Sequence, residues 1–244
     1  MRFRKRKVFF LLNSLEEFNF GHYIKRYLPS THFQIKIGTE IPKNPTKFSI
    51  IIPWSYRSQI QYPEKYKNLV IFHSSDLPRG RGWAPLANLF LKNIPEYTLT
   101  GFLPNCKIDD GDLIIKITFP IETIYTATIL RKWDAQLTII ATRILLDKFK
   151  NDEFIGIKQE ITRATYFEKR TPEMGELNLN SSIVEQINLL RSAEYDHPSY
   201  IVYEGEKLKI VIEPFEPPKF PENIKVNFPK SAEEFDLREI GIEI

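Results

Sequence analysis

Residues 69–85 read LVIFHSSDLPRGRGWAP, and residues 107–113 read KIDDGDL. The first stretch joins a short apolar strand at 69–72 to His73, and then to a loop rich in proline, glycine and arginine. The second stretch is an acidic turn that contains Asp109. Open α/β sheets bind their ligands at the carboxyl ends of the strands. We therefore expect the functional site at the end of the strand that carries His73.

Outward from this stretch, strands and helices alternate. The unbroken apolar run at 8–12 is typical of a strand buried on both faces of a parallel sheet. Residues 33–37, 48–52 and 69–72 are the next candidate strands. Between the first two of these segments, residues 15–28 carry apolar side chains at helical spacing. These patterns predict an α/β, Rossmann-like fold: a mostly parallel sheet with helices on both faces. No GxGxxG follows the first strand, which argues against a dinucleotide site.

The second half of the chain begins with helical periodicity. From Glu122 the apolar spacing predicts a helix of about two dozen residues. The proline-rich stretch at 213–235 predicts an extended surface arm. We place a catalytic domain at 1–150 and a C-terminal extension at 151–244.

Two local signals predict structure within that extension. Ser182 and Glu185 form a capping box for a helix at 183–192. Residues 200–203 and 207–212 read as two strands of a hairpin, joined by a turn that contains glycine. The extension should therefore hold a small helix and a β-hairpin.

Composition excludes several classes of protein. The chain has 34 basic and 31 acidic side chains, and a net charge of +3 is too slight to argue for a nucleic-acid surface. The five apolar residues at 8–12 are too few for a signal peptide, and no run approaches the roughly 20 residues that span a bilayer. The single cysteine, Cys106, permits no internal disulfide, and the four histidines show no metal-ligand spacing. We expect a cytoplasmic protein with no metal, membrane or nucleic-acid partner.

The residues around His73 and Asp109 resemble the folate-dependent formyltransferases. In that family a strand, an HxSxLPxxRG loop and an (L/I)DxGD turn form one site. The interval from His73 to Asp109, 109 minus 73 or 36 residues, also fits the family. Further resemblance lies in ATYFEKRTPEMGEL at 164–177 and LLRSAEYDHPSYIVYEGEKLKI at 189–210. The residues that match the two site motifs are His73, Ser75, Leu77, Pro78, Arg81, Gly82, Ile108, Asp109, Gly111 and Asp112.

The resemblance implies transfer of a formyl group from 10-formyltetrahydrofolate to an amine. A hydrogen-bond donor must stabilise the formyl oxygen as it gains negative charge, and a base must take the proton that the amine loses. His73 would be the donor and Asp109 the base. A lone histidine at a strand end is more often a core residue, but the surrounding loop reverses that expectation. The resemblance also implies that backbone groups of one loop hold the folate: Pro104, Asn105, Cys106, Lys107 and Ile108.

Cationic and aromatic residues near the motifs are candidates for binding the second substrate. Guanidinium groups suit a pyrophosphate, and aromatic rings can stack on a base or a pterin. Loop arginines are often merely solvated, and aromatic residues mostly serve the core. The candidates are Trp54, Tyr56, Arg79, Arg81, Trp83, Tyr166, Lys169 and Arg170.

The length of the C-terminal half bears on the substrate. The tRNA-formylating members of the family continue into a basic domain, whereas the 94 residues after Lys150 (244 minus 150) are not markedly basic. The resemblance thus favours short enzymes that formylate a nucleotide-linked amino sugar, with a 4-amino dideoxyhexose preferred, for O-antigen or related polysaccharide biosynthesis. We also expect a homodimer through the hairpin and the arm. The alternatives are a methionyl-tRNA formyltransferase and a hydrolase that deformylates the folate.

One position departs from the family pattern. Formyltransferases usually carry an asparagine two residues before the histidine, where its amide helps to hold the oxyanion, and this chain has Ile71 there. Loss of one such donor costs about 10²- to 10³-fold in rate in other enzymes. Either Ser74, Ser75 or a backbone amide replaces it, or the enzyme is slow, or the chain is a non-catalytic binding relative.

Overall fold

The first half of the chain forms a parallel sheet. Its strands are β1 (Arg6–Leu11), β2 (Phe33–Gly38) and β3 (Ile50–Pro53), in the order β2-β1-β3. All four residues of β3 are buried, as an apolar run in a parallel sheet requires. The structure, a computed structural model, describes residues 5–17, 20–151, 153–231 and 233–242.

A second sheet continues from the first and is antiparallel. The backbone N–H of Val70 donates to Ile51 O (3.0 Å), which brings β4 (Ile71–His73) beside β3. From β4 the order runs through β6 (Glu96–Pro104) and β7 (Gly111–Pro120) to two C-terminal strands. The α/β, Rossmann-like prediction is confirmed. The parallel pairs are those of the first sheet and the short pair of residues 81–82 with residues 166–167, whereas the five-stranded sheet is antiparallel.

The sequence did not reveal the long hairpin of β6 and β7. Gly101 interrupts β6, and a Cβ at this position would lie 2.7 Å from a side-chain carbon of Ile115. A glycine inside a strand weakens the local strand signal, yet here it permits close packing across the sheet. The acidic turn that drew attention as a motif is the connection between the two strands.

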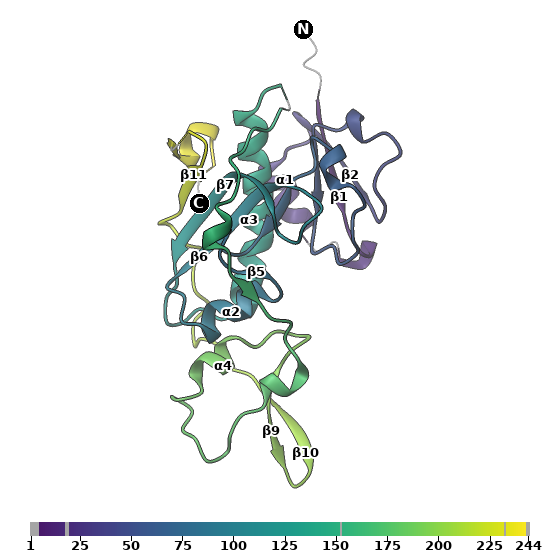
Figure 1. Cartoon of the computed structure of the whole chain (residues 1–244). Helices are drawn as coiled ribbons and strands as arrows, with labels where there is room; N and C mark the ends of the chain where they lie inside the picture. Colours follow the sequence, from purple (N-terminus) through teal and green to yellow (C-terminus); the bar gives the residue numbers. More distant parts are fainter. Residues whose placement is uncertain (1–4, 18–19, 152, 232, 243–244) are drawn as a thin grey trace.

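The described residues contain four α-helices, and Figure 1 shows α3 running through the middle of the molecule. The predicted helix after Glu122 is α3 (Ala127–Lys148), which begins late because the Thr126 side chain caps it by accepting from Ile129 N–H. The others are α1 (Gly21–Tyr27), α2 (Pro85–Leu91) and α4 (Ile187–Arg191). Helix α1 is shorter than the predicted 15–28. Short 3-10 helices lie at Leu15–Glu17, Pro45–Lys47, Pro63–Lys65, Ile161–Arg163, Pro172–Gly175 and Leu237–Ile240.

The two local signals in the C-terminal extension are found in the structure. Ser182 Oγ accepts from Glu185 N–H (3.2 Å), while the Glu185 carboxylate accepts from Ser182 N–H (2.8 Å). Helix α4 itself starts only at Ile187, because residues 183–186 form turns. The hairpin is β9 (Ser199–Tyr203) with β10 (Glu206–Ile210), and Figure 1 shows it at the far end of the molecule from β1.

The predicted surface arm is wrong in its second half. Strand β11 (Lys225–Phe228) pairs with β7, and β12 (Glu233–Phe235) pairs with β11. Val226 and Phe228 are 1% and 2% exposed in the main core. Prolines concealed a short strand that buries only alternate side chains, so the end of the chain contributes to the sheet of the site.

Phe228→Ala is therefore expected to destabilise the protein by about 3 kcal/mol, since it leaves a cavity in a close-packed core. Phe215, which is fully exposed in the same proline-rich stretch, provides the matched control. Phe215→Ala should change the unfolding free energy by less than about 0.5 kcal/mol. Urea denaturation of both variants measures the difference, and equal stabilities would mean that β11 is not docked.

Candidate active site

His73 and Asp109 come together at the end of β4. His73 pairs with Thr100 of β6 and is 9% exposed. Its Nδ1 lies 3.6 Å from Asp109 Oδ2, and its Nε2–H donates to Gly80 O at 2.8 Å. Both ring nitrogens thus face acceptors, and only the imidazolium form can donate from both.

The position of Asp109 depends on its turn and on a glycine of the neighbouring loop. Asp109 has a φ of 46°, a left-handed conformation that aspartate tolerates better than most residues. Its Oδ2 accepts from Gly82 N–H at 2.8 Å. Gly111, two residues later, has a φ of 130°, and a Cβ there would lie 2.0 Å from Leu103 O. The DxGD spacing is therefore required by the backbone of the turn.

Arg81 is a structural residue of the site, which corrects its predicted role in binding pyrophosphate. The residue is 2% exposed, and its Nη2 forms an ion pair with Asp110 Oδ1 at 2.7 Å. Nε and Nη2 both donate to Gln159 Oε1, and Nη1 donates to Tyr166 OH at 3.3 Å. Each nitrogen of this guanidinium group therefore donates at least one hydrogen bond within the protein.

The Arg81 network extends to the backbone that holds the candidate base. Gln159 Nε2 donates to Asp109 O (3.0 Å) and to Gly111 O (3.2 Å). Burial alone would raise the pKa of Asp110, but the hydrogen bond from Asn105 and the charge of Arg81 lower it below its usual value. Neither Asp110 nor Gln159 was expected to carry the site. The sequence signal for Asp110 was its place inside the acidic turn, and Gln159 lies shortly before the stretch at 164–177.

Three predicted substrate residues gather beside the loop of Arg81. Strand β5 (Arg81–Gly82) pairs with β8 (Tyr166–Phe167), which brings the two motifs together. Tyr166 is 63% exposed and Trp83 is 55% exposed. Lys169 Nζ lies 5.2 Å from the centre of the Trp83 ring. These residues form the open rim, and Arg79 is also exposed.

Three other predicted substrate residues are buried or half-buried. Trp54 is 9% exposed and its ring lies 4.8 Å from that of Phe20, while Tyr56 packs against the cluster of Phe9. Arg170 is 5% exposed and donates from Nη1 to Ser192 O at 2.7 Å. Burial lowers the pKa of Arg170. The burial of Trp54 and Arg170 argues against a direct ligand role for these two, whereas Tyr56 is half-buried.

The loop at 104–108 connects β6 to the acidic turn. Pro104 is buried, and Asn105 donates to Asp110 Oδ2 at 3.1 Å while its own Oδ1 accepts from Lys107 N–H. Cys106 is free and exposed, and Ile108 is 68% exposed. The base of this loop is thus fixed and its tip is open. Among the described residues, no cluster of three metal-ligating side chains occurs, and no helix could cross a bilayer.

Ile71 and the two serines after His73 occupy different environments. Ile71 packs against Leu77, Phe102 and Leu113. Ser74 Oγ donates to Asp134, a buried carboxylate that also accepts from Tyr97 OH. Ser75 Oγ is buried, and the described part of the chain supplies no hydrogen-bond partner for it. Of the two serines, only Ser75 has an uncommitted hydroxyl.

The structure is an α/β fold in which a histidine and an aspartate approach each other at a strand end, beside an Arg–Gly loop. This is the arrangement that the resemblance to the formyltransferases implied. Comparisons with known proteins agree, although no family model matches the chain. The chain is 27% identical over 200 residues to methionyl-tRNA formyltransferase of Rickettsia felis, covering 81% of this chain and 65% of that protein. It is 33% identical over 152 residues to methionyl-tRNA formyltransferase of Caldanaerobacter subterraneus, and the match covers 60% of this chain and 49% of that protein. The chain thus spans about half to two thirds of these relatives.

Solved structures of similar fold include both kinds of formyltransferase. Methionyl-tRNA formyltransferase from Clostridium thermocellum has a TM-score of 0.69 at 20% identity, covering 91% of this chain and 99% of that one. A 4-N formyltransferase from Francisella tularensis has a TM-score of 0.64 at 18% identity, and the match covers 85% of this chain and 97% of that one. HypX from Aquifex aeolicus, in complex with tetrahydrofolic acid, has a TM-score of 0.70 at 16% identity. This match covers 85% of this chain and 37% of that one. The resemblance to the formyltransferase family is confirmed.

Proposed function

We propose that this protein is an N-formyltransferase that transfers the formyl group of 10-formyltetrahydrofolate to the amine of a nucleotide-linked amino sugar. The observation that carries the proposal is the 3.6 Å approach of His73 Nδ1 to Asp109 Oδ2, with the carboxylate held by Gly82 N–H. The curated relatives support formyl transfer. The choice of an amino sugar as the acceptor is the more specific part of the proposal.

The two side chains have complementary tasks. The folate supplies the formyl group. The nitrogen of the sugar amine forms a bond to the formyl carbon, and the bond between that carbon and the folate nitrogen breaks. The folate nitrogen takes up a proton and tetrahydrofolate leaves. Asp109 accepts the proton that the amine loses, and His73 donates a hydrogen bond to the oxygen that gains charge. Because Nε2–H is bonded to Gly80 O, the formyl oxygen must replace that carbonyl as its acceptor.

The loop at 104–108 suits a pterin. Asn105 fixes the base of the loop through Asp110, while the backbone around Cys106 and Ile108 is exposed beside Asp109. Backbone amides and carbonyls there could pair with the donor and acceptor edge of the pterin. The tetrahydrofolic acid complex of HypX supports a folate in this fold.

Ser75 takes the place of the missing asparagine in this proposal. Ile71 offers only an apolar side chain, and Ser74 is engaged with Asp134. A buried hydroxyl without a partner is unfavourable in the free protein, and it becomes a useful donor when a charged oxygen arrives.

Ser75→Ala should lower kcat for formyl transfer by about tenfold or more, with little change in KM. The variant should be as stable as the wild type, because the lost hydroxyl makes no hydrogen bond with the described residues. Initial rates and thermal melting measure both effects. An unchanged kcat would assign the oxyanion to other donors.

The exposed rim favours a nucleotide-linked substrate. Trp83 and Tyr166 offer aromatic faces for a base or sugar, and Lys169 offers a cation for phosphate. Arg79 is a further exposed cation on the same loop. We retain the 4-amino dideoxyhexose as the preferred acceptor and surface polysaccharide biosynthesis as its use. The similarity to a 4-N formyltransferase fold supports this choice.

Methionyl-tRNA formylation is the second candidate, favoured by the curated relatives. The deciding experiment offers 10-formyltetrahydrofolate with UDP-, GDP- and dTDP-linked amino sugars, or with charged initiator tRNA, and reads the formyl mass gain. Transfer to one sugar supports the first proposal. Transfer to tRNA, with binding that weakens steeply in salt, supports the second. Folate binding without any transfer would mark a non-catalytic relative, and release of formate alone would mark a hydrolase.

Dimerisation through the hairpin β9–β10 remains part of the proposal. The hairpin exposes apolar side chains, among them Tyr203 (56% exposed) and Leu208 (46% exposed). Exposed apolar groups on an isolated hairpin favour burial against a second copy. The mass of one chain is 28.7 kDa, and light scattering at micromolar concentration should give twice this mass. The mass of a monomer would rule the dimer out.

A further inference from the structure

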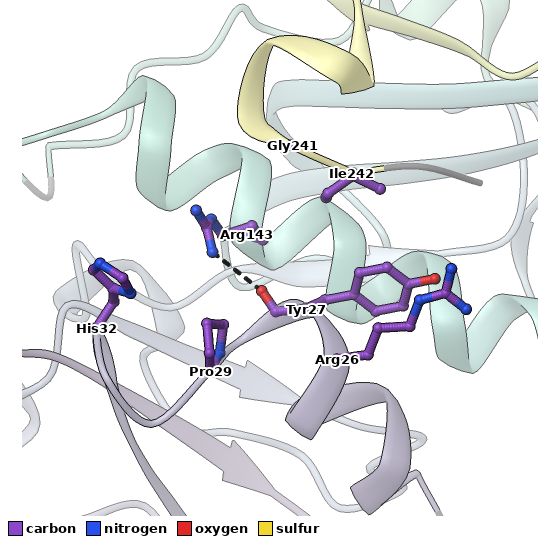
Figure 2. Close-up of a pocket in the computed structure, with 7 residues that line it drawn as sticks. All are labelled: Arg26, Tyr27, Pro29, His32, Arg143, Gly241 and Ile242. Atoms are coloured by element: carbon purple, nitrogen blue, oxygen red, sulfur yellow. Dashed lines mark hydrogen bonds between the residues drawn. The ribbon is translucent and has the colours of Figure 1, made fainter.

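A cavity lies at the amino ends of the strands of the parallel sheet, away from the site of His73. Its volume is about 430 Å³. His32 precedes β2, and its carbonyl accepts from Arg6 N–H at the start of β1 (3.1 Å), so the cavity is at the amino ends of the strands. His73 follows the carboxyl end of β4. The lining includes Arg26, Tyr27, Pro29, His32, Arg143 and Ile242, as Figure 2 shows.

Arg143 is held in place at this cavity by two contacts. Its Nε donates to Asp147 Oδ2 at 2.5 Å, and its Nη1 donates to Tyr27 O at 3.4 Å. Within the described residues, Nη2 has no hydrogen-bond partner. The guanidinium group of α3 is therefore oriented by the protein and retains a donor for a ligand.

His32 adds a ring nitrogen and Arg26 adds a cation from the segment around α1. His32 Nδ1 pairs with Thr31 Oγ1 at 2.8 Å, which leaves Nε2 without a partner in the part of the chain that the structure describes. Arg26 lies beside the ring of Tyr27, with 5.1 Å between its Cζ and the ring centre. Figure 2 shows His32 and Arg143 at one end of the pocket and Arg26 at the other.

We propose that this cavity binds the phosphoryl group of a small molecule, with Arg143 and His32 as its hydrogen-bond donors and Arg26 adding attraction. A phosphoryl group has enough oxygens to accept from both donors, and a guanidinium group matches its geometry. The volume is in the range of small-molecule sites. The site is separate from the formyl-transfer chemistry.

The test is a calorimetric titration of the whole chain with inorganic phosphate and, separately, with adenosine 5′-monophosphate. Arg143→Gln removes the guanidinium group and should weaken phosphate binding by about tenfold. Asp147→Asn should instead tighten binding by about threefold, because it removes a competing negative charge from the same guanidinium. A gain in affinity cannot come from loss of folding.

Arg57→Gln is the matched control, since Arg57 also pairs with one aspartate, Asp196, but lies outside the cavity. Its phosphate affinity should equal that of the wild type. Proton NMR places the ligand: phosphate should shift the imidazole signal of His32, identified with His32→Asn, and leave that of His73 unchanged. Absence of binding, or equal affinity in Arg143→Gln and Arg57→Gln, would overturn the proposal. Tighter binding of the nucleotide than of phosphate would show that the site also contacts the organic part.

Discussion

Asp109→Asn is expected to lower formyl transfer by about 10³-fold while the protein stays folded, because an amide cannot take the proton of the attacking amine. The amide oxygen of asparagine can still accept from Gly82 N–H, so the turn should keep its shape. The change in unfolding free energy should stay below about 1 kcal/mol. Single-turnover transfer measured by mass spectrometry, beside urea denaturation, separates the two quantities.

Asp76 provides the control for this prediction. It lies on the loop after β4, is exposed, and pairs with Lys116. Asp76→Asn removes an equal charge near the site without removing the candidate base, so transfer should change by less than about threefold. Equal losses in the two variants would show that Asp109 acts only through the overall charge of the site.

Arg81→Met is expected to destabilise the protein by about 3–5 kcal/mol, because it leaves the buried carboxylate of Asp110 without its partner. The side chains of the pair are 3% and 12% exposed, so solvent screens this interaction little. Gln159 Oε1 also loses its donors, and Gln159 holds the backbone of Asp109. Formyl transfer should therefore fall together with stability. Urea denaturation gives the free energy of unfolding.

Two further measurements test that mechanism. Arg79→Met, two residues away on the same loop but exposed, should change stability by less than about 0.5 kcal/mol. Adding Asp110→Asn to Arg81→Met should recover part of the lost stability, because the unpaired charge is removed. If the double variant is no more stable than Arg81→Met, the buried charge is not the cause.

The pH dependence follows from the lowered pKa of Asp110. A carboxylate whose pKa is lower in the folded state stabilises the fold above its unfolded pKa, and this contribution is lost as the pH falls through the folded value. The stability difference between wild type and Arg81→Met should thus be largest near neutral pH. It should narrow as the pH falls below the usual value of 3.8.

Local patterns in the chain predicted much of the fold and the central pair. Strands β1 and β3 were readable because a strand buried on both faces needs an apolar run. Strand β2, at the edge of the sheet, was readable from apolar residues at alternate positions. The hairpin β9–β10 and the capping contact of Ser182 were readable because each depends on a few adjacent residues. His73 and Asp109 were found through motifs whose spacing follows from a strand end and a tight turn.

Only the tertiary structure decided which polar groups are committed. Arg81 and Arg79 were both candidates for binding a phosphate, although only Arg81 matches the loop motif. The structure shows that Arg81 is buried beside Asp110 and Gln159, whereas Arg79 is exposed. The hydroxyl of Ser74 donates to Asp134 of α3, whereas the hydroxyl of Ser75 has no hydrogen-bond partner among the described residues. Strand β11 and the cavity of Arg143 likewise join segments more than a hundred residues apart. Hydrogen-bond partners and burial depend on such distant contacts, which no local pattern of residues encodes.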